Sequence, residues 1–214
     1  MAEDKPRAKL VLASASPRRL ALLERVGLAP DLLCPSEVDE TPLRFETPRR
    51  LAIRLAEAKA RAVVDLPLVR ELGELTFVLA ADTVVGVGRR NVPKPTRETD
   101  VQASLALLSG RSHWVYSAVC LIDAKGKMTS RCNETKVRFK RLSSEDIAAY
   151  VASGEWRGKA GGYAIQGRAE AFVRQIYGSY SGVVGLPLYE TVSLLEGAGF
   201  PVYHHLMHKP SVLV

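Results

Sequence analysis

The chain has 214 residues, of which 47% are hydrophobic and 25% charged, a composition typical of a globular protein with one sizeable α/β domain or two small ones. No stretch is long and apolar enough to span a bilayer, and residues 1–5 lack the apolar core of a signal peptide, so a cytoplasmic protein is expected. The formal net charge of +7 suggests an anionic partner, but it does not choose between a nucleotide, a nucleic acid and no partner.

The N-terminal segment predicts a buried strand at residues 10–13, a loop of small hydroxyl residues and a helix that begins at Pro17. Ser16 suits the cap of that helix, and proline suits its first position. Arg18 and Arg19 then lie in the first turn, where the helix dipole favours negative charge. This placement indicates a bound anion such as phosphate, although a solvated basic face explains it equally well.

The middle of the chain alternates predicted strands and helices, with apolar residues at the matching periods. The predicted elements are a strand at 30–33, a helix opened by Thr47 and Pro48 and ending near 64, a strand at 76–81 extended by 84–87, a turn at 88–91 and a helix at 98–108.

The C-terminal part predicts a long β-hairpin and then a glycine-rich region. The expected elements are strands at 113–122 and 128–139, a helix from 144 to about 154, strands near 163–166 and 171–177, and a helix from Pro187 to about 197, with a loose tail after about residue 200. No linker or repeat interrupts the pattern, so one α/β domain with two lobes around a cleft is expected.

Asp82 follows the very apolar run at 77–81, so it is predicted at or just past the end of a strand. Ligands of open α/β sheets bind at the carboxyl ends of strands, which makes Asp82 a candidate functional carboxylate. A turn or capping role is the simpler alternative.

Lys59 and Lys94 are candidate phosphate ligands for different reasons. Lys94 lies between Pro93 and Pro95, which hold its backbone rigid, and Lys59 has small alanine neighbours on its helix. Solvated surface lysines explain both positions as well.

An acidic loop contains Glu37, Asp39 and Glu40 in an otherwise basic chain. Carboxylate oxygens suit Mg²⁺, which proteins hold with one or two carboxylates together with substrate phosphates. Solvated loop acids are the alternative.

The segment at 159–168 combines Lys159, the pair Gly161 and Gly162, and Gln166. Glycines permit close backbone approach to a ligand, and a glutamine amide can read the edge of a base, but a strand with a bulge explains the glycines too.

Cysteine and histidine patterns predict no metal site. Cys34, Cys120 and Cys132 match no metal or redox spacing and are expected as buried or half-buried thiols, and the pair His204 and His208 lacks a third ligand. The common glycine-rich nucleotide-binding motifs are also absent.

Taken together and in order, these segments resemble the Maf family of nucleoside triphosphate pyrophosphatases. The matching segments are LASASPRR at 12–19, Glu40, EAKA at 57–60, ADTVV at 81–85, KP at 94–95, LSGR at 108–111, KAGGYAIQG at 159–167 and VGLPL at 184–188. The resemblance covers residues 9–198 as one domain and treats 1–8 and 199–214 as terminal extensions. It implies a mixed, elongated sheet flanked by helices, similar to the inosine triphosphatase-like architecture.

The resemblance further implies hydrolysis of a nucleoside triphosphate to a monophosphate and pyrophosphate, with a divalent cation (Mg²⁺, Mn²⁺ or Co²⁺) as cofactor. It implies Asp82 as general base, Arg18, Lys59 and Lys94 as phosphate ligands beside Ser14, and Glu40 as a metal ligand. It also implies a homodimer as the assembly, with no membrane and no specific nucleic acid as partner.

The segment YAIQG at 163–167 is similar to the branch of the family that prefers dTTP and UTP, and it implies a role in base choice for Arg18, Thr83 and Gln166. Gly158 stands where the family commonly has an aspartate, which puts the metal and the order of that loop in question. A non-catalytic binder of nucleotides or nucleic acid, and the same chemistry on purine or modified nucleotides, are the alternatives.

Overall fold

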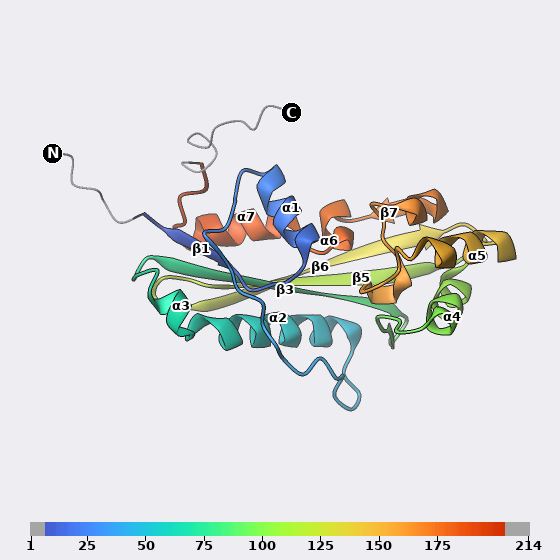
Figure 1. Cartoon of the computed structure of the whole chain (residues 1–214), viewed down its shortest axis with the longest axis horizontal. Coiled ribbons are helices and arrows are strands. Elements are labelled where there is room, and N and C mark those ends of the chain that lie inside the picture. Colours follow the sequence, from blue (N-terminus) through green and yellow to red (C-terminus); the bar gives the residue numbers. More distant parts are fainter. Residues whose placement is uncertain (1–6, 204–214) are drawn as a thin grey trace.

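The computed structural model describes residues 7–203 and contains one mixed seven-stranded sheet flanked by helices (Figure 1). The strand order is β2-β1-β3-β5-β6-β7, with β4 paired to β3 beside β1. β1 is parallel to both β2 and β3, and the other pairs are antiparallel. The strands are β1 (Lys9–Leu12), β2 (Leu32–Leu33), β3 (Thr76–Val87), β4 (Arg90–Val92), β5 (Ser112–Ile122), β6 (Met128–Phe139) and β7 (Val173–Tyr177).

The helices cover both faces of the sheet and one of its ends (Figure 1). α1, α6 and α7 lie on one face, α2 and α3 lie on the other, and α4 and α5 gather at the far end. The helices are α1 (Pro17–Arg25), α2 (Pro48–Val64), α3 (Pro67–Arg70), α4 (Glu98–Leu108), α5 (Ser144–Ser153), α6 (Tyr180–Val184) and α7 (Leu188–Gly197), with short 3₁₀ helices η1 (Ala160–Gly162) and η2 (Arg168–Phe172). None of the helices in the described part of the chain is long and apolar enough to cross a membrane.

The α2 helix follows its predicted bounds because its start signal and its apolar period agree. The Thr47 hydroxyl accepts a hydrogen bond from the Arg50 amide, and Pro48 occupies the first turn. Leu51, Leu55 and other residues on one side are buried against β3 and β5. That face also buries Lys59, so this lysine points toward the sheet rather than into solvent.

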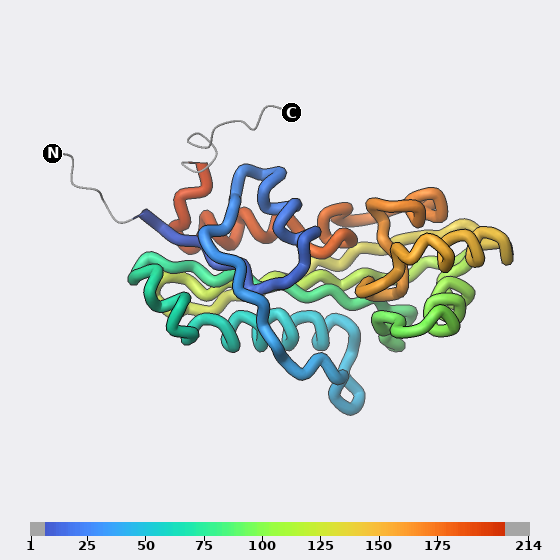
Figure 2. The backbone as a smooth tube through the Cα atoms, viewed as in Figure 1, coloured from blue at the N-terminus to red at the C-terminus, as the bar shows by residue number. Residues whose placement is uncertain are grey.

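The interior has three packed cores, and β3 contributes side chains to all of them. Alternation sends successive β3 side chains to opposite faces of the sheet. Leu79 and Ala81 pack into the core beneath α1 and α7, whereas Val78 and Ala80 pack into the core beneath α2. Past the middle of the strand, Val85 joins a third core with α4 and α5. The tube in Figure 2 shows the long central strands running from one end of the molecule to the other, with helices on both sides of them. The predicted single α/β domain with two lobes is confirmed.

Three predictions of local structure are wrong. β3 runs unbroken through Asp82, which lies in mid-strand and not at a strand end. The predicted turn at 88–91 is shorter, because β4 begins at Arg90 and Val87 pairs with Arg90 across a two-residue loop. Residues 163–166 form no strand, since they connect η1 and η2, and the next strand begins only at Val173.

The loose tail expected after about residue 200 falls largely on residues 204–214, which lie outside the described residues, and the short described part differs from the expectation at Val202. Phe200 and Val202 are each 3% exposed, and the Phe200 ring packs edge-on against Phe77 with ring centroids 5.2 Å apart. Burial of these side chains extends the core beneath α7 to the last described residues.

Candidate active site

A gap in the sheet beside β3 creates the site. β1 pairs with β3 only as far as Leu79, and β4 pairs with it only from Val85. Between them, residues 80–84 have no strand neighbour on this side among the described residues, and Asp82 lies at the centre of the gap. A carboxylate in mid-strand can therefore face a cavity, because the neighbouring strand that would cover it is missing.

Successive side chains of β3 point to opposite faces, so the gap connects both faces of the sheet. Asp82 points toward α2 and meets Lys59, whereas Thr83 points toward α6 and meets Ser117 and Gly185. Both Asp82 and Thr83 line one cavity of about 230 Å³.

The structure brings the predicted site residues together around this cavity. They come from separate segments of the chain, and all eight line the cavity: Ser14, Arg18, Glu40, Lys59, Asp82, Thr83, Lys94 and Gln166. Their roles are taken up as proposals below.

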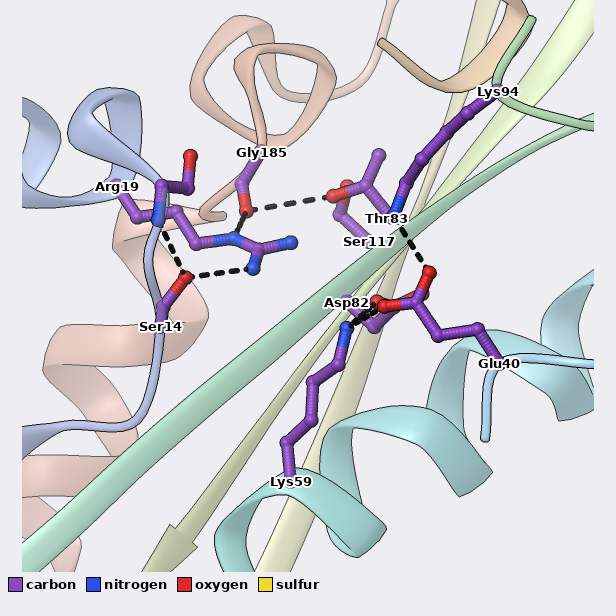
Figure 3. Close-up of polar contacts among 10 residues, drawn as sticks. Ser14, Arg19, Glu40, Lys59, Asp82, Thr83, Lys94, Ser117 and Gly185 are labelled. Atoms are coloured by element: carbon purple, nitrogen blue, oxygen red, sulfur yellow. Dashed lines mark hydrogen bonds and ion pairs between the residues drawn. The ribbon is translucent and has the colours of Figure 1, made fainter. Parts of the chain in front are cut away.

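Two carboxylates and two ammonium groups form a continuous chain through the cavity (Figure 3). Lys59 Nζ donates to Asp82 Oδ1 and to Glu40 Oε1, both at 2.6 Å, and Lys94 Nζ donates to Glu40 Oε2 at 2.6 Å. Asp82 is 3% exposed and Lys59 is 7% exposed. Among the described residues, none donates a hydrogen bond to Asp82 Oδ2, so this oxygen is available to a ligand or water.

The two lysines hold Glu40 in its charged form. Partial burial acts to raise the pKa of Glu40, but the hydrogen bonds and charges of Lys59 and Lys94 outweigh it and lower the pKa to about 2. The carboxylate is thus ionised at any pH at which the protein works.

Arg19 is the second arginine of the pair that predicted a bound anion, and it also lines the cavity, although the family resemblance assigned it no role of its own. Its Nε donates to the Gly185 carbonyl at 2.9 Å, and one terminal nitrogen donates to Ser14 Oγ at 3.0 Å (Figure 3). Burial lowers the pKa of Arg19, although the charges of Asp82 and Glu40 oppose that shift. The signal was the arginine pair itself, and both of its members line the cavity.

The start of α1 differs from the prediction in one detail. The Ser16 side chain makes no capping hydrogen bond, and instead Ser14 Oγ accepts from the Ser16 amide at 3.2 Å. Ser14 thereby joins the loop, the helix start and the Arg19 guanidinium, which leaves the N-terminus of α1 facing the cavity.

Charge in the cavity lining is strongly unbalanced. Five cationic side chains line it against the carboxylates of Glu40 and Asp82; the cations are Arg18, Arg19, Lys59, Lys94 and Lys159. Burial lowers the pKa of both Arg18 and Lys159, and each also feels a neighbouring arginine. Groups that repel one another in this way are stabilised by a polyanion placed between them.

The far wall of the cavity comes from the segment around Tyr163, which belongs to the core with α4 and α5. Tyr163 lines it, and its hydroxyl lies 2.8 Å from Nε2 of His113, which is 1% exposed. Within residues 7–203, His113 Nδ1 has no hydrogen-bond partner, and burial lowers the pKa of this histidine to about 4, so the ring is neutral. Nothing in the local sequence around His113 indicates this contact.

Comparison with known protein families identifies the family of this chain. A family model described as Maf-like protein matches residues 9–198. The chain belongs to this family. The family predicted from the sequence is therefore confirmed.

Several curated relatives of this Maf-like chain are named dTTP/UTP pyrophosphatase. A dTTP/UTP pyrophosphatase of Rhodopseudomonas palustris (strain ATCC BAA-98 / CGA009) is 59% identical over 198 residues, which is 92% of this chain and 96% of the relative. Proteins of the same name from Mesorhizobium japonicum and Agrobacterium fabrum are 59% and 55% identical, and each alignment covers 91% of this chain and 94% of the relative. Among solved structures, a nucleoside-triphosphatase / dITP/XTP pyrophosphatase from Mycobacterium abscessus matches with a TM-score of 0.37 and 21% identity, over 64% of this chain and 76% of that one.

Metal-binding groups are few in the Maf-like chain. Within residues 7–203, no group of three or more His, Cys, Asp or Glu side chains could hold a metal ion. Cys34 and Cys120 are buried thiols and Cys132 is half-buried, as expected, while His204 and His208 lie outside the described residues. Glu40 and Asp82 are the carboxylates of the cavity, and such a pair fits a hard cation whose other ligands are phosphate oxygens and water.

Proposed function

We propose that this protein hydrolyses nucleoside triphosphates, with dTTP and UTP as its main substrates, to a monophosphate and pyrophosphate. The observation that carries the proposal is the cavity itself, in which five cationic side chains surround a buried carboxylate. The names of relatives at 55–60% identity supply the substrate class.

Binding of the triphosphate follows from charge. Arg18, Lys59 and Lys94 neutralise phosphate oxygens, and Ser14 adds a hydroxyl at the N-terminus of α1, where the helix dipole favours an anion. Fixed cations of this kind stabilise the charge that develops on the phosphates during reaction and need no rearrangement at that moment. Pyrophosphate is then a good leaving group, so no covalent intermediate on the protein is required.

Asp82 is the proposed general base. Lys59 holds Oδ1, which orients the carboxylate and leaves Oδ2 to accept a proton from a water molecule that attacks the α-phosphorus. Proton transfer to a well-placed base contributes on the order of 10²- to 10⁴-fold to the rate.

Glu40 would hold a divalent cation such as Mg²⁺, Mn²⁺ or Co²⁺ together with the phosphates. When bound, such an ion neutralises phosphate charge and polarises the bond that breaks. Lys59 lies between the carboxylates of Glu40 and Asp82 and limits their mutual repulsion before the cation arrives.

Base choice is assigned to Arg18, Thr83 and Gln166, all of which line the cavity. The remaining expectations, a cytoplasmic location and a homodimer, belong to the same proposal and rest on the family resemblance. They are tested by fractionation of cells and by the mass of the protein in solution.

A panel of triphosphates tests the proposed function. Pyrophosphate release is followed for dTTP, UTP, CTP, ATP, GTP and ITP, each with Mg²⁺, Mn²⁺, Co²⁺ or a chelator. We expect release from dTTP and UTP to exceed release from the others, and to be lost with the chelator. Preference for a purine changes the substrate; no release from any triphosphate, together with salt-sensitive binding to DNA, supports a non-catalytic binder instead.

A further inference from the structure

The hydroxyl of Thr83 lies among groups that accept hydrogen bonds. On the face of β3 opposite Asp82, Thr83 Oγ1 lies 3.0 Å from Ser117 Oγ and 3.4 Å from the Gly185 carbonyl oxygen. Ser117 Oγ in turn donates to the Gly182 carbonyl at 2.5 Å. Figure 3 shows Thr83, Ser117 and Gly185 side by side, and of these Thr83 and Gly185 line the cavity.

Counting protons fixes the direction of these hydrogen bonds. A serine hydroxyl has one proton, and Ser117 gives it to the Gly182 carbonyl, which can only accept. Ser117 must therefore accept from Thr83. The Gly185 carbonyl is also only an acceptor, so both partners within the protein compete for the single Thr83 proton. What Thr83 presents to the cavity is a lone pair.

The relay that sets this direction is rigid. Ser117 is 1% exposed, and its acceptor Gly182 is held because the Gly182 amide donates to Ser179 Oγ at 2.9 Å. The Ser179 amide is bound by Thr135 Oγ1 on β6 at 2.9 Å. The α6 segment therefore cannot turn its carbonyls away from β5 without breaking several buried contacts.

We propose that Ser117 is a positioning residue for base selection: it keeps Thr83 an obligate hydrogen-bond acceptor, so that the cavity favours bases with a ring N–H. This inference rests on the proposed function and deepens it. Thymine and uracil carry a donor N3–H between two carbonyl oxygens, whereas N3 of cytosine is an acceptor. Arg18 can only donate and Thr83 can only accept, so together they match the edge of thymine or uracil and oppose that of cytosine.

The test compares UTP with CTP in Ser117→Ala. Without the serine oxygen, only the longer contact of 3.4 Å to the Gly185 carbonyl holds the Thr83 proton, so the hydroxyl can rotate and offer this proton to cytosine N3. We expect the ratio of kcat/KM for UTP to that for CTP to fall about tenfold, as expected for one hydrogen bond of this kind. Ser181→Ala is the matched control, because Ser181 belongs to the same α6 network but has no contact with Thr83. The proposal is overturned if the ratio of kcat/KM for UTP to that for CTP falls in both variants, or if it falls in neither.

A second measurement needs no variant. The triphosphate of N3-methyluridine keeps both carbonyl oxygens of UTP but carries a methyl group in place of the N3 proton, so the wild-type enzyme should use it at least about tenfold less well. Equal use of the two substrates overturns the proposal even if Ser117→Ala does not fold. If the wild-type protein hydrolyses neither dTTP nor UTP, the proposed function fails, which is a separate result from an unchanged UTP to CTP ratio.

Discussion

Lys59 Nζ on α2 lies 2.6 Å from Asp82 Oδ1 at the middle of β3, and both side chains are almost completely buried. A buried ion pair often stabilises a fold no better than apolar residues of the same volume, because both charges lose their water. Its position at a gap in the sheet, where the cavity begins, gives the pair a functional explanation rather than a structural one.

Asp82→Asn should abolish catalysis and leave substrate binding in place. The amide keeps the shape of the side chain and one oxygen but cannot take the proton of the attacking water, so kcat should fall by about 10²- to 10⁴-fold. Pyrophosphate release measures the loss, and titration with a non-hydrolysable UTP analogue measures binding. Near-normal turnover in this variant would remove Asp82 as the general base.

Lys59→Met should destabilise the protein far more than Lys94→Met. The first change leaves the buried carboxylate of Asp82 without its partner, which costs about 3 kcal/mol of unfolding free energy. The second breaks a contact between side chains that are 46% and 41% exposed, which costs less than about 1 kcal/mol. Urea unfolding compares the two, and equal losses would contradict the burial of the Lys59–Asp82 pair.

His113 predicts a pH-dependent loss of stability. Because burial lowers its pKa to about 4, from 6.5 in the unfolded chain, only the unfolded chain gains a proton as the pH falls below about 6.5. Stability should therefore decrease between about pH 6.5 and pH 4, by about 3 kcal/mol in total, with no contribution from His113 above that window.

The variant that tests this is His113→Phe combined with Tyr163→Phe, which keeps the aromatic packing with Phe139 and leaves no hydroxyl without a partner. Urea unfolding at several pH values should show that the free energy of unfolding changes less with pH in the double variant than in the wild type. The same change of unfolding free energy between about pH 6.5 and pH 4 in both proteins would mean that His113 is protonated in the folded protein.

Phe200→Ala should lower the free energy of unfolding by about 3–5 kcal/mol, since it empties a site in the core against Phe77. Tyr189→Ala is the matched control, because Tyr189 is 80% exposed and its truncation should cost less than about 0.5 kcal/mol. Thermal or urea unfolding of both variants checks the pair. A small effect at Phe200 would support the loose tail that the sequence predicts.

Local pattern accounts for most of the secondary structure. α2 follows its Thr47 cap and its apolar spacing, and the β5–β6 hairpin follows two long predicted strands joined by a turn. Such signals act within a few residues of one another, so they are readable without the fold. Residues 163–166 are the counterexample. Their apolar side chains pack into the core with α4 and α5, but their backbone does not pair in the sheet.

The site divides in the same way. The types and order of Arg18, Glu40, Lys59, Asp82 and Lys94 are written in the chain, and they were enough to expect an anionic ligand and the family. Their convergence depends on the lengths of β1 and β4, which stop short of each other and leave Asp82 uncovered in mid-strand. The directions of Arg19, Ser117 and His113 depend on how distant elements pack, and no nearby residue carries that information because the contacts that set them join segments tens of residues apart.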